Sequence, residues 1–460
     1  MTSPRAASMS RIGHAYDVDN CHDVQRLADA IEQEILSTQS IARTGKVLEV
    51  IGMLVKVAGL DVTLGELCEL RAPDGELLQH AEVIGFTQHV ALLSPFSRLA
   101  DISRSTRVVG LGRSLTVPVG DALLGRVIDS LGEPIDGLGP VYTNEDRPVF
   151  ANPPSPMRRR MIDTPLATGV RAVDSMMTLA EGQRMGIFAP AGVGKSTLLG
   201  MFARGAQCDM TVIALIGERG REVREFVELI LGADGMARSV VVCATSDRSS
   251  IERAKAAYVA TAIAEHFRDR GQRVLLMMDS LTRFARAQRE IGLAAGEPPA
   301  RRGFPPSIFA ELPRLLERAG MGEHGSITAL YTVLAEDDSG NDPIAEEVRG
   351  IVDGHMILSR EIAAKSQYPA IDVLASLSRV MPQVMTDDYV RAAARLRDLL
   401  SRHREVELLL QIGEYQAGGD PLVDEAIRKI DAIRTFFNQA TNEFAAPQDT
   451  EARLFQLANS

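Results

Sequence analysis

The chain has 460 residues, of which 45% are hydrophobic and 24% charged. This length predicts two or three domains, and the composition is that of an ordinary globular protein, which argues against general disorder. The 61 acidic residues outnumber the 50 basic ones and give a formal net charge of −11. That balance disfavours broad attraction to nucleic acid or anionic lipid, and an aromatic share of 5% without Trp provides little surface for stacking bases.

The four cysteines, at positions 21, 68, 208 and 243, lie too far apart for a paired zinc site or a small disulfide framework. We therefore expect reduced thiols in a cytosolic protein. No apolar run follows Arg5 and Arg11, so a secretory signal is not expected. Because no run of about 18 apolar residues occurs, no transmembrane helix is expected, and any membrane association would come through partners.

The first 160 residues fall into three stretches of different composition and hydrophobic pattern. Residues 1–43 are predicted to be a tail followed by a short amphipathic helix, which either packs on the next domain or docks a partner. Residues 44–116 contain short β-branched runs broken by Gly, which predicts a small β-barrel. Residues 117–160 are rich in Pro and Gly and are predicted to be a linker. The helical spacing in the first segment is carried by Val24, Leu27, Ile31 and Ile35.

Residues 161–385 alternate apolar strand-like runs with helical patterns, which predicts an α/β domain with a mainly parallel sheet covered by helices. The predicted strands are Met185–Phe188, Val212–Ile216, Val240–Ala244, Val274–Met278 and Ile327–Leu334. Residues 386–460 have helical periodicity and are predicted to be a C-terminal helical domain. Its expected inward positions are Leu396, Leu399, Leu400, Val406, Leu409, Leu410 and Ile412.

Residues 189–196 read Ala-Pro-Ala-Gly-Val-Gly-Lys-Ser, which matches the phosphate-binding loop with Ala in place of its first Gly. Ala costs little there if its φ is negative. The loop follows an apolar run and opens a helix-forming stretch, so amides and the helix N-terminus can face phosphate oxygens. Lys195 is predicted to reach the β- and γ-phosphates, and the Ser196 hydroxyl to ligate Mg²⁺. The predicted nucleotide-binding residues are Ala191, Gly192, Val193, Gly194, Lys195, Ser196 and Thr197.

Two carboxylates are predicted to complete this site. Asp279 ends the run 274–278, where a second magnesium-coordinating group belongs, although a strand-capping Asp is the other reading. Glu218 follows the run 212–216, and the carboxyl edge of a parallel sheet would place it beside the phosphates. There it could orient or deprotonate the attacking water. From position alone, a solvated salt-bridged face remains the alternative for Glu218.

Residues 369–378 read Pro-Ala-Ile-Asp-Val-Leu-Ala-Ser-Leu-Ser. They fit a signature of the superfamily that contains the catalytic subunits of rotary ATP synthases. Over about residues 40–440 the chain resembles the catalytic ATPases of type III secretion and flagellar export. The export branch is indicated by residues 168–174, 283–299 and 312–320, and its injectisome members rather than the flagellar alternative by residues 405–415.

The resemblance implies a magnesium-dependent ATPase with a RecA-like core that works in a ring, usually a homohexamer. It implies that Glu218 is the catalytic glutamate and that Arg219 lies near the γ-phosphate. Arg379 falls where the family places an arginine finger that reaches into a neighbour's site. Tyr331 falls near a family tyrosine that contacts adenine, with a core role as the other reading.

The resemblance also implies partners and a place in the cell. It assigns the barrel to ring assembly and the C-terminal helices to docking of secretion chaperones and export substrates. Stator, regulator and central stalk proteins of the export apparatus are further expected partners. The loop 297–306 is read as pore-facing or as a plain connector. The implied location is cytoplasmic, peripheral at the inner face of the bacterial inner membrane.

Two other functions compete with this reading. One is a non-catalytic nucleotide-binding ring subunit, and the presence of both Lys195 and Glu218 argues against it. The other is an RNA-translocating ring helicase. The acidic balance and a barrel whose Phe residues are Phe86 and Phe96 alone leave little platform for single strands, so no nucleic-acid partner is expected.

Overall fold

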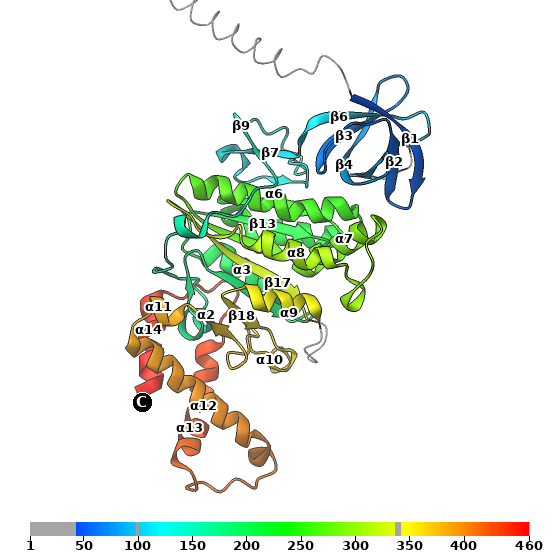
Figure 1. The fold of residues 1–460 in the computed structure, drawn as a ribbon. Coiled ribbons are helices and arrows are strands. Elements are labelled where there is room, and N and C mark those ends of the chain that lie inside the picture. The colour runs from blue at the N-terminus through cyan, green and yellow to red at the C-terminus, as the bar shows by residue number, and fades with distance from the viewer. Residues whose placement is uncertain (1–42, 98, 100, 336–341, 460) are drawn as a thin grey trace, which may run out of the picture.

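The computed structural model describes residues 43–97, 99, 101–335 and 342–459. The short helix predicted over Val24–Ile35 lies outside these residues. Figure 1 shows three parts in succession: an N-terminal barrel, a central domain of sheet and helices, and a group of C-terminal helices. No helix in the described ranges is long and apolar enough to span a bilayer.

The first part is a closed six-stranded barrel with strand order β1-β2-β5-β4-β3-β6, which confirms the predicted β-barrel. Closure pairs every strand on both sides and leaves no open edge. Small β-branched and aliphatic residues such as Val55, Val57 and Leu93 fill its interior. The strands are β1 (Arg43–Ile51), β2 (Leu54–Ala58), β3 (Glu66–Arg71), β4 (Leu77–Thr87), β5 (Val90–Pro95) and β6 (Arg107–Ser114).

Residues 117–160, predicted to be a linker, contribute short strands instead of only connecting domains. β7 (Thr116–Val119) pairs with β9 (Glu145–Pro148), and β8 (Val127–Ile128) joins the edge of the central sheet next to β14 (Ser239–Ala244). A two-residue strand is too short to show a period in the sequence, so Pro and Gly dominated the prediction. A turn, η1 (Asp121–Leu123), precedes β8.

The central sheet has nine strands in the order β19-β18-β12-β17-β15-β13-β14-β8, with β16 pairing to β17 off this path. The pairs from β18 to β8 are parallel, so their carboxyl ends meet at one edge. Each predicted apolar run lies inside one strand. The strands of this sheet not yet given are β12 (Arg184–Ala189), β13 (Met210–Ile216), β15 (Arg273–Asp279), β16 (Gly320–Met321), β17 (Ser326–Leu334), β18 (Gly354–Ile357) and β19 (Leu377–Ser378). A separate two-stranded sheet is formed by β10 (Pro165–Leu166) and β11 (Leu179–Ala180).

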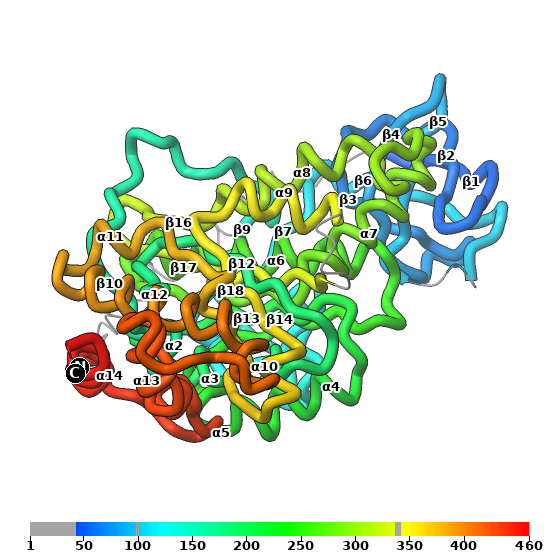
Figure 2. The backbone as a smooth tube through the Cα atoms, turned by 90° about the horizontal axis from the view of Figure 1, so that it is seen from below, coloured from blue at the N-terminus to red at the C-terminus, as the bar shows by residue number. Residues whose placement is uncertain are grey.

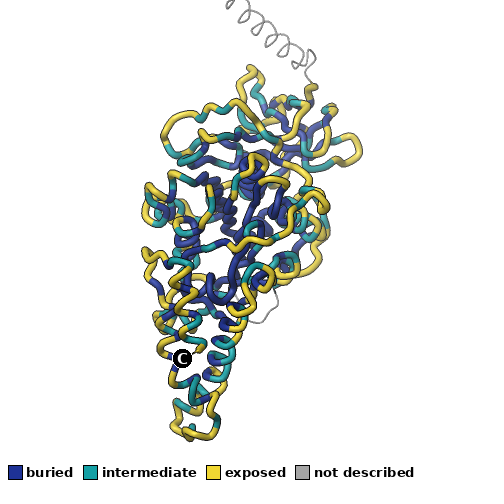
Figure 3. Tube along the Cα trace, turned by 90° about the vertical axis from the view of Figure 1, so that its left-hand side faces the viewer, coloured by how far each residue is buried: buried dark blue, intermediate teal, exposed yellow. Residues whose placement is uncertain are grey.

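Helices cover both faces of this sheet. Val212 and Ala214 of β13 belong to one core cluster and Ile213 to another, because successive strand residues point to opposite faces. Figure 3 shows that buried residues concentrate in this central part. The helices are α2 (Arg171–Met176), α3 (Lys195–Gly205), α4 (Gly220–Glu225), the π-helical turn η3 (Phe226–Leu231), α5 (Gly232–Ala237), α6 (Ser250–Asp269), α7 (Leu281–Ala294), α8 (Pro306–Leu316), α9 (Pro343–Ile351) and α10 (Arg360–Ala364), with 3-10 turns η2 (Pro156–Arg158) and η4 (Arg301–Gly303).

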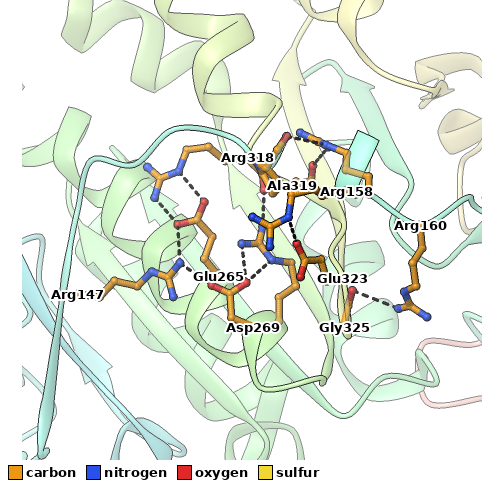
Figure 4. A network of polar contacts seen from close by, with 12 residues as sticks. Arg147, Arg158, Arg160, Glu265, Asp269, Arg318, Ala319, Glu323 and Gly325 are labelled. Carbon is orange, nitrogen blue, oxygen red and sulfur yellow. Dashed lines mark hydrogen bonds and ion pairs between the residues drawn. The ribbon is translucent and has the colours of Figure 1, made fainter. Parts of the chain in front are cut away.

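An arginine-rich network lies at the amino ends of the parallel strands and ties residues 147–160 to the central domain (Figure 4). Arg318 is buried and donates to both carboxylate oxygens of Glu265, at 2.9 and 2.7 Å, and to Val149 O at 2.9 Å. Arg147 donates to Asp269 at 2.7 Å. The segment is therefore fixed on the core at the sheet edge opposite to the strand carboxyl ends.

The C-terminal part is helical, as predicted, and comprises α11 (Met381–Val384), α12 (Asp387–Gln411), α13 (Pro421–Phe437) and α14 (Pro447–Asn459). α13 and α14 contact α2, on the side of the core remote from the barrel (Figure 2). Leu396 and Leu399 are buried as expected. The inward placement of Leu409 and Ile412 was wrong, since they are 41% and 58% exposed. Leu409 lies in the last turn of α12 and Ile412 follows it. The connection between α12 and α13 forms the end of the molecule remote from the barrel (Figure 1), and we call this end, residues 408–422, the exposed tip.

Candidate active site

The phosphate loop joins the carboxyl end of β12 to the start of α3. Gly192 and Gly194 have φ of +83° and +87°, a left-handed backbone that favours glycine, and Gly194 is the residue before the helix. Ala189 has no positive φ, so Ala in place of the first loop Gly carries no such strain. The first amides of α3 lack partners within the helix and are available to an anion.

The side of the loop toward solvent is open. Ala191, Gly192 and Ser196 are exposed, whereas Val193 is buried and anchors the loop on the core. Thr197 is half-buried in the first turn of α3. The loop thus presents main-chain amides and the Ser196 hydroxyl on an accessible surface.

Three predicted residues meet at the carboxyl edge of the sheet. Lys195 Nζ donates a hydrogen bond to Asp279 Oδ1 and lies 3.9 Å from Glu218 Oε1. Asp279 is the last residue of β15, and Glu218 comes two residues after the neighbouring strand β13. Asp279 also accepts a hydrogen bond of 2.8 Å from Thr332 Oγ1 of β17. One cation and two carboxylates therefore share a small volume next to the phosphate loop.

The protonation of Glu218 depends on this crowding. Burial, followed by the nearby Asp279 carboxylate, raises the pKa of the Glu218 carboxyl to about 7, although the Lys195 ammonium opposes both effects. A hydrogen bond with Glu222 adds to the rise in pKa. A carboxyl group with this pKa exchanges a proton near neutral pH, as a general base for water requires.

Arg219 does not join the cluster within one chain. Its side chain is 81% exposed and pairs with Glu222 at 3.2 Å. Arg283, which the sequence analysis did not select, lies closer. Its Cβ, Cγ and Cδ are 3.2–3.3 Å from where a side chain on Gly217 would begin, and its charge lowers the pKa of Glu218. Its buried Nε has no hydrogen-bond partner among the described residues.

Tyr331 is not available to a base, so its expected contact with adenine was wrong. It lies in the middle of β17, between Gly186 of β12 and Met278 of β15, and is fully buried. The structure gives it the core role, because a strand paired on both sides and covered by helices encloses its ring. The tyrosine beside the phosphate loop is Tyr368, which is 41% exposed. Its ring carbons Cδ1 and Cε1 lie 3.6 Å from the position of a β-carbon on Gly194.

A C-terminal segment, residues 436–445, holds Tyr368 in place. Asn438 Oδ1 accepts the Tyr368 N–H at 3.1 Å, and the Gln439 N–H donates to Tyr368 O at 2.8 Å. The buried Gln439 side chain also accepts from Arg171 N at 2.9 Å and donates to Gly169 O at 2.7 Å. The same segment reaches the phosphate-loop helix, since Arg204 of α3 donates to Thr441 O at 2.6 Å.

Arg379 lies away from this cluster in its own chain. It follows β19 at the edge of the sheet, and its main-chain N–H donates to Asp353 O at 3.0 Å, next to the amino end of β18. Its side chain is exposed and forms no hydrogen bond or ion pair within the described ranges. The phosphate loop lies at the other end of the strands.

Comparisons with known proteins divide the chain into the same three parts. Residues 47–112 match the beta-barrel domain of the ATP synthase alpha/beta family, and residues 169–378 match its nucleotide-binding domain. Residues 385–456 match the T3SS EscN ATPase C-terminal domain. A type 3 secretion system ATPase of Xanthomonas euvesicatoria is 70% identical over 424 residues, which cover 92% of this chain and 96% of that protein.

The chain belongs to the type III secretion ATPases. The assembled ATPase EscN from the type III secretion system of enteropathogenic E. coli has a TM-score of 0.86 and 46% identity, over 90% of this chain and all of that one. EscN in complex with its central stalk EscO matches with a TM-score of 0.84. A flagellum-specific ATP synthase of Bacillus subtilis is 49% identical over 95% of this chain and 99% of that protein. The identity of 70% supports the injectisome branch of the type III secretion ATPases over the flagellar one.

Proposed function

We propose that this type III secretion ATPase hydrolyses Mg-ATP in a homohexameric ring, with each site built from the Lys195, Glu218 and Asp279 cluster of one subunit and Arg379 of its neighbour. The observation that carries the proposal is the separation of these groups within one chain. The cluster lies at the carboxyl edge of the sheet, while the exposed Arg379 side chain has no partner in the described part of its own subunit. A heterologous contact in a closed ring brings such separated surfaces together.

Different residues of the site bind the phosphates, the magnesium ion and the base. The main-chain amides of residues 191–197 and the Lys195 ammonium bind the β- and γ-phosphates. To do so, Lys195 gives up its hydrogen bond to Asp279. Asp279 and the Ser196 hydroxyl are hard oxygen ligands that suit Mg²⁺, which would supply charge neutralisation at the phosphate oxygens. Tyr368 lies against the base.

Hydrolysis itself needs an activated water. The Glu218 carboxylate accepts a proton from the water whose oxygen forms the new bond to the γ-phosphorus, and the bond from that phosphorus to the ADP oxygen breaks. Arg219 and Arg283 flank the γ-phosphate on the Glu218 side. Arg379 of the neighbouring subunit stabilises the charge of the transition state.

The exposed tip supports partner docking. Leu408, Leu409 and Ile412 of the α12 end and Leu422 of α13 are 38% to 65% exposed there, and an apolar surface of this kind marks an interaction site. EscN has been solved with its central stalk bound. We assign the tip to the stalk, chaperones and export substrates, the barrel to ring assembly, and loop 297–306 to the pore. Contacts of the ring with stator and regulator proteins hold it at the inner face of the bacterial inner membrane, in the cytoplasm.

Turnover measured against protein concentration tests the shared site. Wild type should gain specific activity as rings form, and Arg379→Ala should stay nearly inactive at all concentrations. An equal mixture of Arg379→Ala and Lys195→Ala should recover activity, because sites that combine an intact loop with a neighbour's intact Arg379 reappear at about a quarter of positions in a randomly mixed ring.

Arg391→Ala is the matched control, since Arg391 is also an exposed arginine but pairs with Asp388 of its own helix. It should keep wild-type turnover. If the mixture stays as inactive as its components although rings form, or if Arg379→Ala alone keeps full turnover, Arg379 does not act across an interface.

A further inference from the structure

Thr332 connects the phosphate-loop strand with the strand that carries Asp279. It lies on β17, which is paired with β12 on one side and β15 on the other, and it is opposite Ile187 of β12. Its side chain is fully buried. The hydroxyl Oγ1 lies 2.8 Å from Asp279 Oδ1 and 3.2 Å from Met278 O. A hydroxyl has one proton to donate, and the shorter contact to the carboxylate is the stronger bond.

The two donors to Asp279 differ in mobility. Of the described residues, Lys195 and Thr332 donate hydrogen bonds to this carboxylate, both at Oδ1. Lys195 is a long side chain that must turn toward phosphate when nucleotide binds. Thr332 is a short, branched side chain inside a central strand and has no such freedom. The Asp279 side chain is only 5% exposed, so little water can reach its carboxylate to donate in place of Lys195.

We propose that Thr332 is a positioning residue for Asp279. Its hydroxyl keeps Oδ1 engaged and so fixes the plane of the carboxylate while Lys195 moves to the nucleotide. Carboxylates that serve a metal ion are commonly oriented by a hydrogen-bond partner of this kind. This inference rests on the role of Asp279 toward Mg²⁺ proposed above.

A second threonine beside the carboxyl end of β17 is already engaged elsewhere. Thr282 Oγ1 accepts the Leu334 N–H at 2.9 Å, which fixes the start of α7 on the strand. Thr328, on the same strand, is also buried, but its hydroxyl accepts the Gly182 N–H at 2.9 Å at the amino end, away from Asp279. Thr328 therefore offers a matched control with the same residue type, strand and degree of burial.

The test compares Thr332→Val, Thr332→Ala and Thr332→Ser with Thr328→Val. The first readout is the magnesium concentration that gives half-maximal ATPase activity. The second is the Kd of a fluorescent ADP analogue measured once with magnesium and once with EDTA. The third is Tm, which reports a purely structural effect.

Thr332→Val and Thr332→Ala should raise the half-maximal magnesium concentration about tenfold, the size seen when outer-shell partners of metal ligands are removed. They should lose most of the gain in ADP affinity that magnesium gives, while the Kd in EDTA stays at the wild-type value. Thr332→Ser keeps the hydroxyl and should restore both quantities. Thr328→Val should keep the wild-type response to magnesium, even where it lowers Tm as much as the Thr332 variants do.

Wild-type magnesium dependence in both Thr332→Val and Thr332→Ala overturns the inference, as does a shift of equal size in Thr328→Val. Two hydroxyl-free variants are used so that a folding defect in one leaves the other to decide. If the wild type itself gains no ADP affinity from magnesium, the metal role of Asp279 is what fails, and the two failures are thereby distinguished.

Discussion

Among single residues, Glu218 has an environment that makes its protonation sensitive to pH near neutrality. Because burial and Asp279 raise the pKa of its carboxyl to about 7, roughly half of the molecules carry a protonated Glu218 at neutral pH. Only the carboxylate form accepts a proton from water. We therefore expect kcat/KM, which reports ionisations of the free enzyme, to rise as pH increases through about 7 and to fall below it.

Glu222→Ala checks the cause of this pH dependence. The protonated Glu218 carboxyl donates a hydrogen bond to Glu222, which contributes to the raised pKa of Glu218. Removal of Glu222 should therefore lower that pKa and shift the rising limb of the kcat/KM profile to lower pH. The profile is measured at saturating magnesium. A profile that is flat across neutral pH, or a limb that moves to higher pH in the variant, would contradict the assignment of Glu218 as the base.

Substitution of the two tyrosines, Tyr368 and Tyr331, should have different effects on the Kd for ATP. Tyr368→Ala should raise the Kd for ATP about tenfold or more, because stacking of an aromatic ring on a base contributes about 1–3 kcal/mol. Tyr331→Phe removes a buried hydroxyl that has no partner among the described residues and should leave the Kd unchanged. Equilibrium titration with a fluorescent ATP analogue measures both. An unchanged Kd in Tyr368→Ala would exclude this ring from the base pocket.

At the scale of elements, substitution within the buried ion pair between α6 and the residues that follow α8 should lower the stability of the fold. Arg318 and Glu265 are 2% and 1% exposed, so Arg318→Met removes both direct hydrogen bonds of a buried carboxylate and leaves it only the longer ion pair with Arg147, at 3.7 Å, among the described residues. We expect a loss of about 3–5 kcal/mol in the free energy of unfolding, measured with urea. Arg391→Met, which breaks an exposed pair with Asp388, should cost less than about 1 kcal/mol. Equal losses would show that burial does not set the cost.

The elements also show how far the sequence could be interpreted. The five central strands and the phosphate loop were predicted correctly, because apolar runs and glycine spacing are local signals. The edge strand β8 was missed, since two residues show no period. The end of α12 has helical spacing, but spacing does not reveal whether a partner helix covers it, so Leu409 and Ile412 were placed inside. For Tyr331 the adenine contact and the core role were both left open, because the direction in which a strand residue points depends on its neighbours in space.

Arg283 was missed although a signal existed. It lies in the first turn of α7, the helix that directly follows Asp279, and a helix start after a strand at the carboxyl edge faces the ligand in sheets of this kind. The pairing of Lys195 with Asp279 could not be predicted, because it depends on the relative positions of β12, β17 and β15. Local sequence identified most of the chemical groups, and the order of the strands determined which of them meet.

For the whole molecule, the segment 436–445 determines how the C-terminal helices are joined to the site. Gln439→Ala removes side-chain bonds to Gly169 and Arg171 and should loosen the main-chain pairing with Tyr368. We expect faster amide hydrogen exchange in residues 168–171 and in residues 366–369, although these stretches are remote in sequence. Gln416→Ala, an exposed residue of the C-terminal part, is the control and should change neither. Unchanged protection in Gln439→Ala would show that the segment does not stabilise the site.

The same segment contacts Tyr368, beside the phosphate loop, and Arg204, in the last turn of the helix that the loop opens. A partner that displaced α13 would therefore strain both contacts at once without touching the phosphate loop itself. Since linkage between two sites is reciprocal, a partner that binds the exposed tip more tightly when ADP replaces ATP must also, by the same factor, raise the affinity for ADP relative to that for ATP. Through the segment 436–445, binding at the C-terminal helices and binding at the nucleotide site would each change the affinity of the other.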